Sequence, residues 1–160
     1  MTSPLGITYV QVDEALKEQI KASWQSNAGD YLHLGSDGLT VAAVVDGQPL
    51  GVISAFKRNL PEPLAMVREA FIDIIEVQEP FRRQGIGEML VSRVVAWAQD
   101  NGLDQVRAWS EEIRLEALML WRKTGFTFAK VDFERDGQRR YGFYAVRSVP
   151  GKEQDESMRP

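Results

Sequence analysis

The sequence predicts an α/β (α+β) fold with a mixed, mostly antiparallel central sheet flanked by helices. Segments with the two-residue alternation of strands and segments with the helical repeat of apolar residues follow each other in the order β-α-β-β-β-α-β-α-β-β. Asp-Gly pairs at 46–47 and 136–137 separate β-rich runs, and this dipeptide is typical of tight antiparallel hairpins. Because several strands follow one another without an intervening helix, a doubly wound dinucleotide fold is disfavoured.

The first half of the chain predicts a strand, a helix and three further strands. Residues 7–12 alternate as a strand, and Asp13 can cap a helix over residues 14–26. Residues 27–38 contain scattered Gly, Asp and Ser, which indicates an irregular stretch that can hold a short helical turn. The next strands are predicted at residues 39–45, 50–56 and 67–77, and the last of these is expected to be central in the sheet.

The second half predicts two helices and a closing hairpin. Apolar residues at helical spacing indicate a helix over residues 85–101, with Gly102 as its C-terminal stop. After a strand at 105–109, Ser110-Glu111-Glu112 supplies a capping hydroxyl and two acids, so a second helix is predicted to begin there and to end at Thr124-Gly125. The closing hairpin is expected to pair residues 126–133 with residues 140–146.

Composition favours a globular domain over residues 1–149, followed by a polar tail at 150–160 that is predicted to be disordered. The formal charge of −4 disfavours a nonspecific nucleic-acid binder. The chain has no cysteine and one histidine, His33, so thiolate catalysis, disulfides and a zinc centre are not expected. No targeting segment or membrane span is visible, and we therefore expect a cytoplasmic protein without a membrane partner.

The nonapeptide at residues 79–87 carries the clearest chemical signal. It lies between a predicted strand and the long helix, and its glycines, Gly85 and Gly87, let the main chain approach a ligand closely. The first free N–H groups of the helix converge with the positive end of its dipole, and Arg82 and Arg83 add charge. A diphosphate is the anion that suits these donors best, and the alternative is a tight turn with solvated arginines.

Other phosphate-binding loops fit poorly, because the Lys-Ser/Thr pair of a P-loop and the third glycine of a dinucleotide fingerprint are both absent. The loop instead resembles the Gln/Arg-x-x-Gly-x-Gly/Ala loop of the GNAT N-acetyltransferase superfamily, with Arg82, Gly85 and Gly87 at the defining positions. Upstream, residues 75–77 are similar to the cofactor-binding strand of that family. Downstream, residues 117–126 (Ala-Leu-Met-Leu-Trp-Arg-Lys-Thr-Gly-Phe) resemble its Ala-x-x-Leu-Tyr-x-x-x-Gly-Phe segment.

The resemblance implies a GNAT-like domain that binds acetyl-CoA as its cosubstrate and requires no metal. The main chain at Ile75 and Val77 is expected to pair with the pantetheine arm, and Trp121 is expected to lie near the thioester end. The pyrophosphate would be held by the loop and the first turn of the helix, which comprise Arg82, Arg83, Gln84, Gly85, Ile86, Gly87 and Glu88.

In this family a neutral amine attacks the thioester directly, so the protein has to position both reactants and remove a proton. The candidate bases are two carboxylates on the predicted cofactor strand, Asp73 and Glu76. Asp73 stands at a position that resembles a family glutamate often assigned this role. Strand alternation predicts that Asp73 and Glu76 point to opposite faces of the sheet, so that one of them faces the substrate.

Trp121 departs from the family pattern, which often has at this position the tyrosine that protonates the leaving thiolate. Indole cannot donate that proton. Either the thiolate leaves unassisted or through water, or a hydroxyl on the final hairpin, that of Tyr141 or Tyr144, replaces the tyrosine. Arg114 likewise stands where the family frequently has asparagine. Trp121 is interpreted mainly as a core residue, and His33 as an ordinary loop histidine.

We therefore predict an N-acetyltransferase that transfers acetyl from acetyl-CoA to a primary amine, which belongs to a small molecule or to a peptide. Acidic residues near the site, Glu69, Asp73 and Glu76, favour a cationic small molecule. The alternative is a noncatalytic acyl-CoA-binding or regulatory module, motivated by Trp121, and a nucleotide-phosphate binder is the third interpretation. A nucleic-acid partner is not expected, and the oligomeric state, including a homodimer, stays open.

Overall fold

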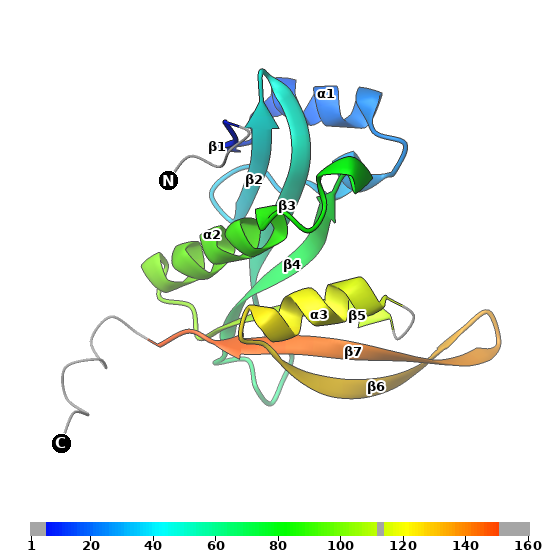
Figure 1. The fold of residues 1–160 in the computed structure, drawn as a ribbon. Coiled ribbons are helices and arrows are strands. Elements are labelled where there is room, and N and C mark those ends of the chain that lie inside the picture. The colour runs from blue at the N-terminus through cyan, green and yellow to red at the C-terminus, as the bar shows by residue number, and fades with distance from the viewer. Residues whose placement is uncertain (1–5, 112–113, 151–160) are drawn as a thin grey trace.

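The computed structural model describes residues 6–111 and 114–150, and within these ranges the chain forms a seven-stranded sheet with helices on both faces (Figure 1). The strand order is β1-β2-β3-β4-β5-β7-β6, and every neighbouring pair is antiparallel except the parallel pair β4–β5. The mixed, mostly antiparallel sheet that the sequence predicts is thus confirmed. The strands are β1 (Thr8–Gln11), β2 (Gly38–Val45), β3 (Gln48–Asn59), β4 (Arg68–Val77), β5 (Gln105–Glu111), β6 (Thr127–Arg135) and β7 (Gln138–Ser148). The helices are α1 (Glu14–Ser23), α2 (Ile86–Asp100), α3 (Leu115–Lys123) and the short 3-10 turns η1 (Ala28–Tyr31) and η2 (Glu79–Phe81).

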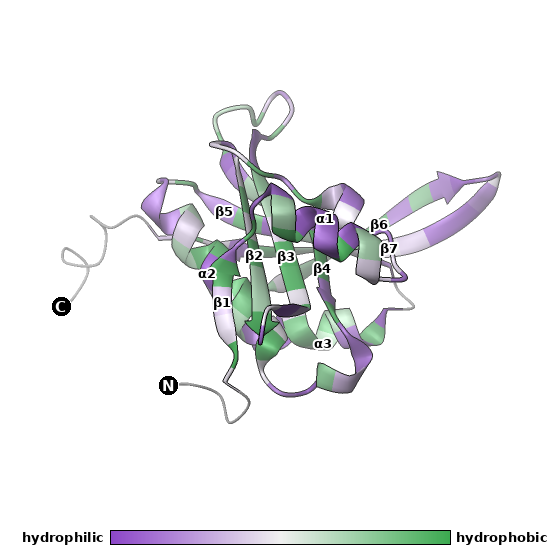
Figure 2. Cartoon of the chain, turned by 90° about the horizontal axis from the view of Figure 1, so that it is seen from above, coloured by the Kyte–Doolittle hydropathy of each residue, from purple (hydrophilic) through white to green (hydrophobic). Residues whose placement is uncertain are grey.

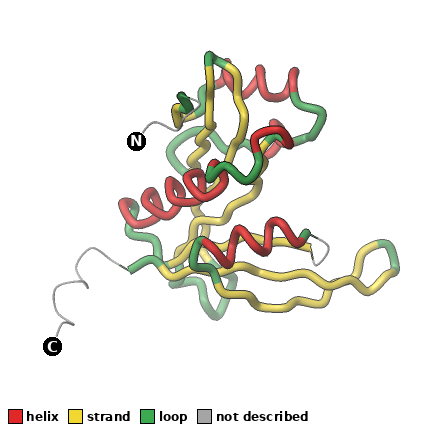
Figure 3. Tube along the Cα trace, in the orientation of Figure 1, coloured by secondary structure: helices red, strands yellow, loops and turns green. Residues whose placement is uncertain are grey.

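Helices α2 and α3 cover one face of the sheet, and α1 covers the opposite face at the β1–β4 end (Figures 1 and 3). We call these two sides the α2 face and the α1 face. The larger core lies on the α2 face, where Leu90, Val91 and Val94 are fully buried. The smaller core lies on the α1 face, where Ile20 and Trp24 pack against β2 and β3. No helix in the described part of the chain is long and apolar enough to cross a membrane.

Both hairpin turns predicted from Asp-Gly pairs are confirmed. Asp46 and Gly47 have φ of 48° and 76°, and Asp136 and Gly137 have φ of 55° and 69°. Positive φ at both central residues is the geometry that matches the twist of the flanking strands. Figure 2 shows that the strands under the helices are predominantly apolar, whereas the far end of the β6–β7 hairpin, which projects from the body, is predominantly polar.

Helix α1 begins as the sequence predicts and ends three residues early. Asp13 caps it, because its Oδ1 accepts a hydrogen bond from the amide of Leu16 at 2.8 Å. The helix ends at Ser23 rather than at residue 26, since Trp24 adopts an extended conformation and buries its ring in the smaller core. The irregular stretch at 27–38 contains η1, the short helical turn that the sequence allows.

The predicted start of the second long helix is wrong. Ser110 and Glu111 are the last residues of β5, and α3 begins at Leu115, while Glu112 lies outside the described residues. Ser110 does not cap a helix. Its hydroxyl instead accepts a hydrogen bond from Nε1 of the buried Trp121 at 2.9 Å. A tertiary contact therefore overrides the local capping preference. The tail predicted at 150–160 lies outside the described residues from residue 151 onward.

A β-bulge in β4 overturns the predicted placement of the two candidate bases. Ser54 of β3 pairs with Ile74 and Ala55 pairs with Ile72, so Asp73 is the extra residue. The bulge reverses the alternation: Ile72 belongs to the larger core, whereas Ile74 packs on the smaller one. As a result, Asp73 and Glu76 both lie toward the α1 face rather than on opposite faces.

Glu69 of β4 is a fully buried carboxylate, and it is neutralised by two arginines. Arg107 contacts it through Nε and Nη2 at 2.8 to 3.2 Å, Arg58 donates to it through Nε at 2.7 Å, and Gln105 adds a fourth donor at 2.8 Å. Burial alone raises the pKa of Glu69, but the hydrogen bonds from these donors and the charge of Arg107 outweigh it and lower the pKa. The cluster joins β3, β4 and β5 on the α1 face.

Replacing Glu69 by Gln should lower the free energy of unfolding at neutral pH by about 2 kcal/mol, because the substitution leaves two adjacent arginines without their counter-charge. The folded pKa lies below the unfolded value of about 4.3, so the contribution of Glu69 is complete above that value and disappears as the pH falls through the folded pKa. Urea unfolding at several pH values gives the free energy of unfolding of wild type and E69Q. The difference between the two proteins should shrink as the pH falls into the acid range. An exposed control, E134Q, should differ little from wild type throughout, and equal effects of both variants would contradict the analysis.

Candidate functional site

An elongated groove of about 1340 Å³ runs between the end of β4, the η2–α2 loop and α3. Its walls come from segments far apart in the sequence that the fold brings together around the end of β4. The lining residues are Ile74, Ile75, Glu76 and Val77 from β4, Phe81, Arg82, Arg83, Gly85, Ile86, Gly87 and Glu88 from the loop and α2, and Arg114, Leu115, Glu116, Ala117, Met119, Leu120, Arg122 and Lys123 from α3 and its start.

The groove exists because β4 and β5 separate. The two strands are paired only from Glu69 and Gln105 to Ile72 and Ala108, and beyond this point β5 continues its pairing with β7 alone. The rest of β4 has a partner in β3 on one side and an open edge on the other. A ligand with amide groups can therefore bind along this edge as an added strand.

Ile75 and Val77 present their main-chain groups to the open edge, as the sequence predicts. The amide of Gln78 donates to Leu50 O on the β3 side, and Val77 O accepts from Arg82 Nε, each at 2.8 Å. Because peptide groups alternate in direction along a strand, the N–H and C=O of Ile75 point the same way as those of Val77. Val77 O is already bonded to Arg82, so Ile75 provides the unengaged pair of groups.

The first amides of α2, which we call the helix mouth, belong to residues that line the groove. Gly85 precedes the helix with φ of 81°, and Arg83 also has a positive φ of 61°. The first intrahelical bond joins Met89 N to Gly85 O at 3.1 Å, so the amides of Ile86, Gly87 and Glu88 have no acceptor within the helix. These donors coincide with the positive end of the helix dipole.

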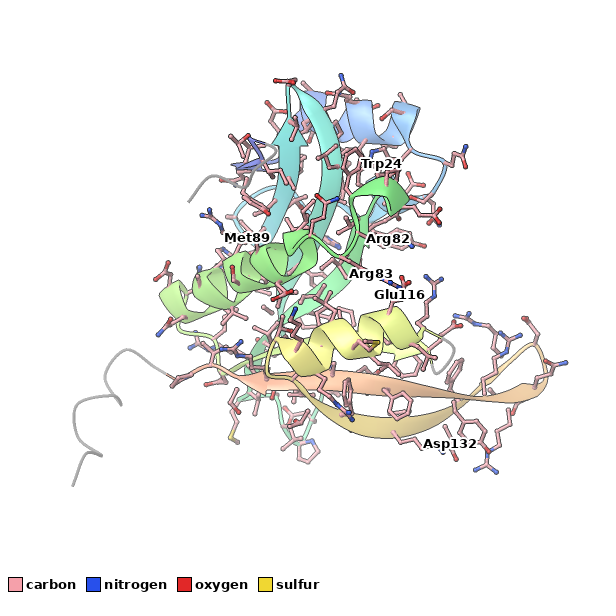
Figure 4. All side chains as sticks on the ribbon, in the orientation of Figure 1. Trp24, Arg82, Arg83, Met89, Glu116 and Asp132 are labelled. Atoms are coloured by element: carbon pink, nitrogen blue, oxygen red, sulfur yellow. The ribbon has the colours of Figure 1, made fainter. Side chains whose placement is uncertain are left out.

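The groove is locally positive although the chain as a whole is acidic. Five cationic side chains and three carboxylates line it, while the formal charge of the chain is −4. Figure 4 shows Arg82 and Arg83 reaching from the loop toward Glu116 of α3. Their ion pairs measure 3.5 and 4.0 Å, and all three side chains are largely exposed. Such exposed pairs are weak, so an incoming phosphate can compete for the arginines.

Two residues predicted to contact the cofactor do not line the groove. Trp121 is only 2% exposed and stacks against Phe126 in the larger core, which confirms its interpretation as a core residue. Its neighbour Leu120 lines the groove instead, 3.4 Å from where a side chain on Gly87 would begin. Gln84 is exposed on the loop, with its amide 3.4 Å from Pro80 O. A cofactor contact by Trp121 or Gln84 remains a prediction that this geometry does not support.

Asp73 forms a pair with His33, which the sequence alone does not indicate. His33 Nε2 lies 2.7 Å from Asp73 Oδ2, although 40 positions separate the two residues. The loop that carries His33 is held in place: its amide donates to Ser54 Oγ at 2.8 Å and its carbonyl accepts from Thr40 Oγ1 at 2.9 Å. The ring packs 4.6 Å from that of Phe56. His33 is therefore held in a fixed position beside Asp73, and neither residue is among those that line the groove.

Of the remaining candidate residues, Glu76 lines the groove and the two tyrosines of β7 do not. Glu76 lines the groove and accepts a hydrogen bond from Gln78 Nε2 at 3.1 Å. Tyr141 and Tyr144 of β7 are not among the groove-lining residues. The ring of Tyr144 packs on the α1 face, with its centroid 5.1 Å from that of Trp109. Within the described residues, no group of three or more His, Cys, Asp or Glu side chains is arranged to hold a metal ion.

Solved structures with the same fold include several acetyltransferases. Arabidopsis thaliana NAA60 in complex with a bisubstrate analogue superposes with a TM-score of 0.72 at 17% identity, covering 91% of this chain and 99% of that one. NAA60 in complex with acetyl-CoA gives a TM-score of 0.72 at 16% identity, with 89% and 98% covered. The ribosomal-protein-S18-alanine N-acetyltransferase from Escherichia coli gives 0.68 at 14% identity, with 93% and 97% covered. At these identities the similarity establishes the fold alone.

Sequence comparison assigns the chain to a family. A search of curated proteins gave no match. The family model described as the acetyltransferase (GNAT) family, however, matches residues 9–126, well over half of the chain. This segment contains β4, the helix mouth of α2 and the whole of α3, which are the elements that form the groove. The chain therefore belongs to the GNAT acetyltransferase family.

Proposed function

We propose that this protein is an N-acetyltransferase that moves the acetyl group of acetyl-CoA to a primary amine. The observation that carries the proposal is the groove itself: an open strand edge for an amide-bearing arm leads to a cluster of helix amides and arginines suited to a pyrophosphate. Family membership supports the same activity, and so does the fold shared with NAA60, which has been solved with acetyl-CoA.

Each part of the cofactor has a counterpart in the groove. The amides of Ile86, Gly87 and Glu88 are suited to the pyrophosphate, with Arg82 and Arg83 beside them. The peptide groups of Ile75 are suited to the pantetheine amides. The acetyl group would then reach the point where β4 leaves β5, beside the bulge at Asp73.

The reaction needs a proton acceptor near the amine, and we infer that it is the Asp73–His33 pair, because Asp73 lies at the bulge directly after the last β4–β5 pair, outside the lining of the groove itself. A primary amine enters as an ammonium ion, so one proton must leave before its lone pair can attack the thioester carbon. Nitrogen then bonds to that carbon, the C–S bond breaks, and coenzyme A leaves as a thiolate. The nitrogen of the adduct gives up its second proton as the amide forms, and water can pass that proton to the thiolate, so that coenzyme A is released as the thiol. Glu76 remains the second candidate base, because its side chain lines the groove and lies toward the same face of β4 as Asp73.

A noncatalytic acyl-CoA-binding module is the alternative, and the burial of Trp121 favours it. The indole is bonded to Ser110 and shielded from the groove, so it offers no proton to a leaving thiolate. A thiolate needs less help than an alkoxide, however, and water can supply the proton. Release of free thiol from acetyl-CoA with an amine panel separates the two functions, since a pure binding module gives none.

Replacing Gly85 by Val should weaken coenzyme A binding by at least about tenfold, because a β-branched residue strains a backbone with φ of 81° and disturbs the amides behind it. Gly137 provides a matched control, since it has φ of 69° and equally open surroundings but lies in the turn at the projecting end of the β6–β7 hairpin. G137V should lower stability without changing affinity. Calorimetric titration of both variants checks this, and similar affinities for G85V and wild type would contradict the assigned site.

Replacing Glu116 by Gln should tighten coenzyme A binding about two- to fivefold, because it removes a carboxylate that competes with phosphate for Arg82 and Arg83. The gain should shrink as salt is added, since exposed charges are screened. E18Q, an exposed change on α1, is the control and should have no effect. Weaker binding by E116Q would show that Glu116 helps to hold the cofactor.

Replacing Asp73 by Asn or His33 by Ala should lower kcat by about 100-fold or more while leaving the Kd for acetyl-CoA unchanged, as expected when a proton acceptor is lost. Steady-state thiol release gives kcat, and calorimetry gives Kd. E76Q tests the other carboxylate under the same conditions. If E76Q alone abolishes turnover, the base is Glu76 and the His33 pair is structural.

A further inference from the structure

A second charged centre lies on the α1 face next to Asp73. It consists of Arg58, Arg107 and Glu69, which together carry two positive charges and one negative charge. Arg58 contacts Glu69 only through Nε, and its side chain is 33% exposed, so its terminal nitrogens are available at the surface. Arg107 is 17% exposed and holds Glu69 through two nitrogens. The centre therefore has an excess positive charge and unused guanidinium donors.

Aromatic rings fix the position of both guanidinium groups. The Arg58 group lies 3.8 Å from the ring centroid of Phe71, and the Arg107 group lies 4.5 Å from that of Tyr144. Stacking on rings orients a guanidinium without using its N–H donors. The rings also remove part of its hydration, which strengthens any bond to an incoming anion.

The proton acceptor and the arginines lie on the same side of the sheet at short range. Asp73 follows Phe71 by two positions along β4, a separation of about 7 Å in an extended strand. His33 and Arg58 both lie near the ring of Phe56, with the Arg58 group 5.8 Å from its centroid. One small molecule can therefore touch the Asp73–His33 pair and the arginines together.

We propose that the acceptor is a primary amine that also carries a carboxylate. This inference rests on the proposed acetyl transfer. The ammonium group binds beside Asp73 and His33, and the carboxylate binds to the free N–H donors of Arg58 and to Arg107. The chemistry covers a free amino acid and the N-terminus of a peptide with a nearby acidic side chain.

From its acidic residues, the sequence predicts a cationic small molecule as the acceptor. The charge distribution in the structure disfavours an acceptor that carries only positive charges. Glu69 contributes no attraction for a cation, because it is fully buried and bonded to two arginines. A polyamine would place its second positive charge against a centre of net positive charge, at a cost in affinity. A zwitterion instead matches a negative pole at Asp73 with a positive pole at the arginines.

Matched pairs of amines test the proposal. Free amino acids are compared with their decarboxylated amines, and short amidated peptides with Asp at the second position are compared with the same peptides carrying Asn. In wild type, kcat/KM should be at least about tenfold higher for the carboxylate member of a pair, the size of effect expected for a charge-assisted hydrogen bond. Preference within the amino-acid pairs identifies a small-molecule acceptor, and preference within the peptide pairs identifies a peptide. No preference in either set, or preference for polyamines, overturns the proposal.

The variant R58Q should remove the preference, because KM for the carboxylate member should rise about tenfold while kcat/KM for the decarboxylated amine falls much less. R93Q is the matched control, because Arg93 also lies over a ring, that of Tyr9 of β1, but on the α2 face at the opposite edge of the sheet from β6. An equal loss with both members of a pair would assign Arg58 a structural role and overturn the proposal. If R58Q unfolds, R58K replaces it, since a lysine keeps the charge but loses the fork of donors.

Direct binding separates this proposal from the proposed acetyl transfer. Calorimetric titration of the protein saturated with coenzyme A measures the affinity for the matched amines without any reaction. Selective binding of the carboxylate member without turnover would support the acceptor site and count against the enzyme. Turnover of amines regardless of a carboxylate would support the enzyme and overturn the acceptor site.

Discussion

The separation of β4 from β5 is the constraint on which the rest of the molecule depends. The parallel pairing ends at Ile72 and Ala108, after which β5 remains paired with β7 and β4 with β3. An unpaired strand edge in the middle of a sheet is normally costly, since its peptide groups lose their partners. Here the edge lines a groove, where Arg82 satisfies one carbonyl and a ligand with amide groups can satisfy others.

The same separation also connects the two faces of the sheet. The groove opens on the side covered by α2 and α3, whereas the Asp73–His33 pair and the arginine centre lie on the side of α1. The groove nevertheless reaches both faces, because Ile74 and Glu76, which lie toward the α1 face, line it together with Ile75 and Val77 from the α2 face. The bulge at Asp73 stands at the gap between the strands and turns its carboxylate toward the α1 face.

The local charge at the groove and at the arginine centre differs in sign from the net charge of the chain. The chain is acidic overall, yet both the groove and the centre around Arg58 and Arg107 have local positive excess. The single negative charge of the buried Glu69 does not cancel the positive excess of the centre, because it is paired with two arginines, Arg58 and Arg107. These local fields, rather than the net charge, bear on which ligands and acceptors can bind.

Local signals determined much of this protein from the sequence. The order of elements, both Asp-Gly turns, the Asp13 cap and the left-handed Gly85 before α2 each depend on neighbouring residues, and all of them appear in the structure. Most residues that the sequence assigns to the cofactor site between Ile75 and Glu88 line the groove, whereas Gln84 and Trp121 do not, and Phe81 lines it without a sequence signal.

Tertiary structure alone decided the rest, because contacts between distant residues outweighed local preference. Ser110 bonds to Trp121 instead of capping a helix, and the bulge brings Asp73 and Glu76 to one face where simple alternation separates them. The partnership of His33 with Asp73 and the neutralisation of Glu69 depend on strand register and loop packing. Neither leaves a periodic or spacing signal in the chain, since His33 lies 40 positions from Asp73, and Arg58 and Arg107 lie 11 and 38 positions from Glu69 on other strands.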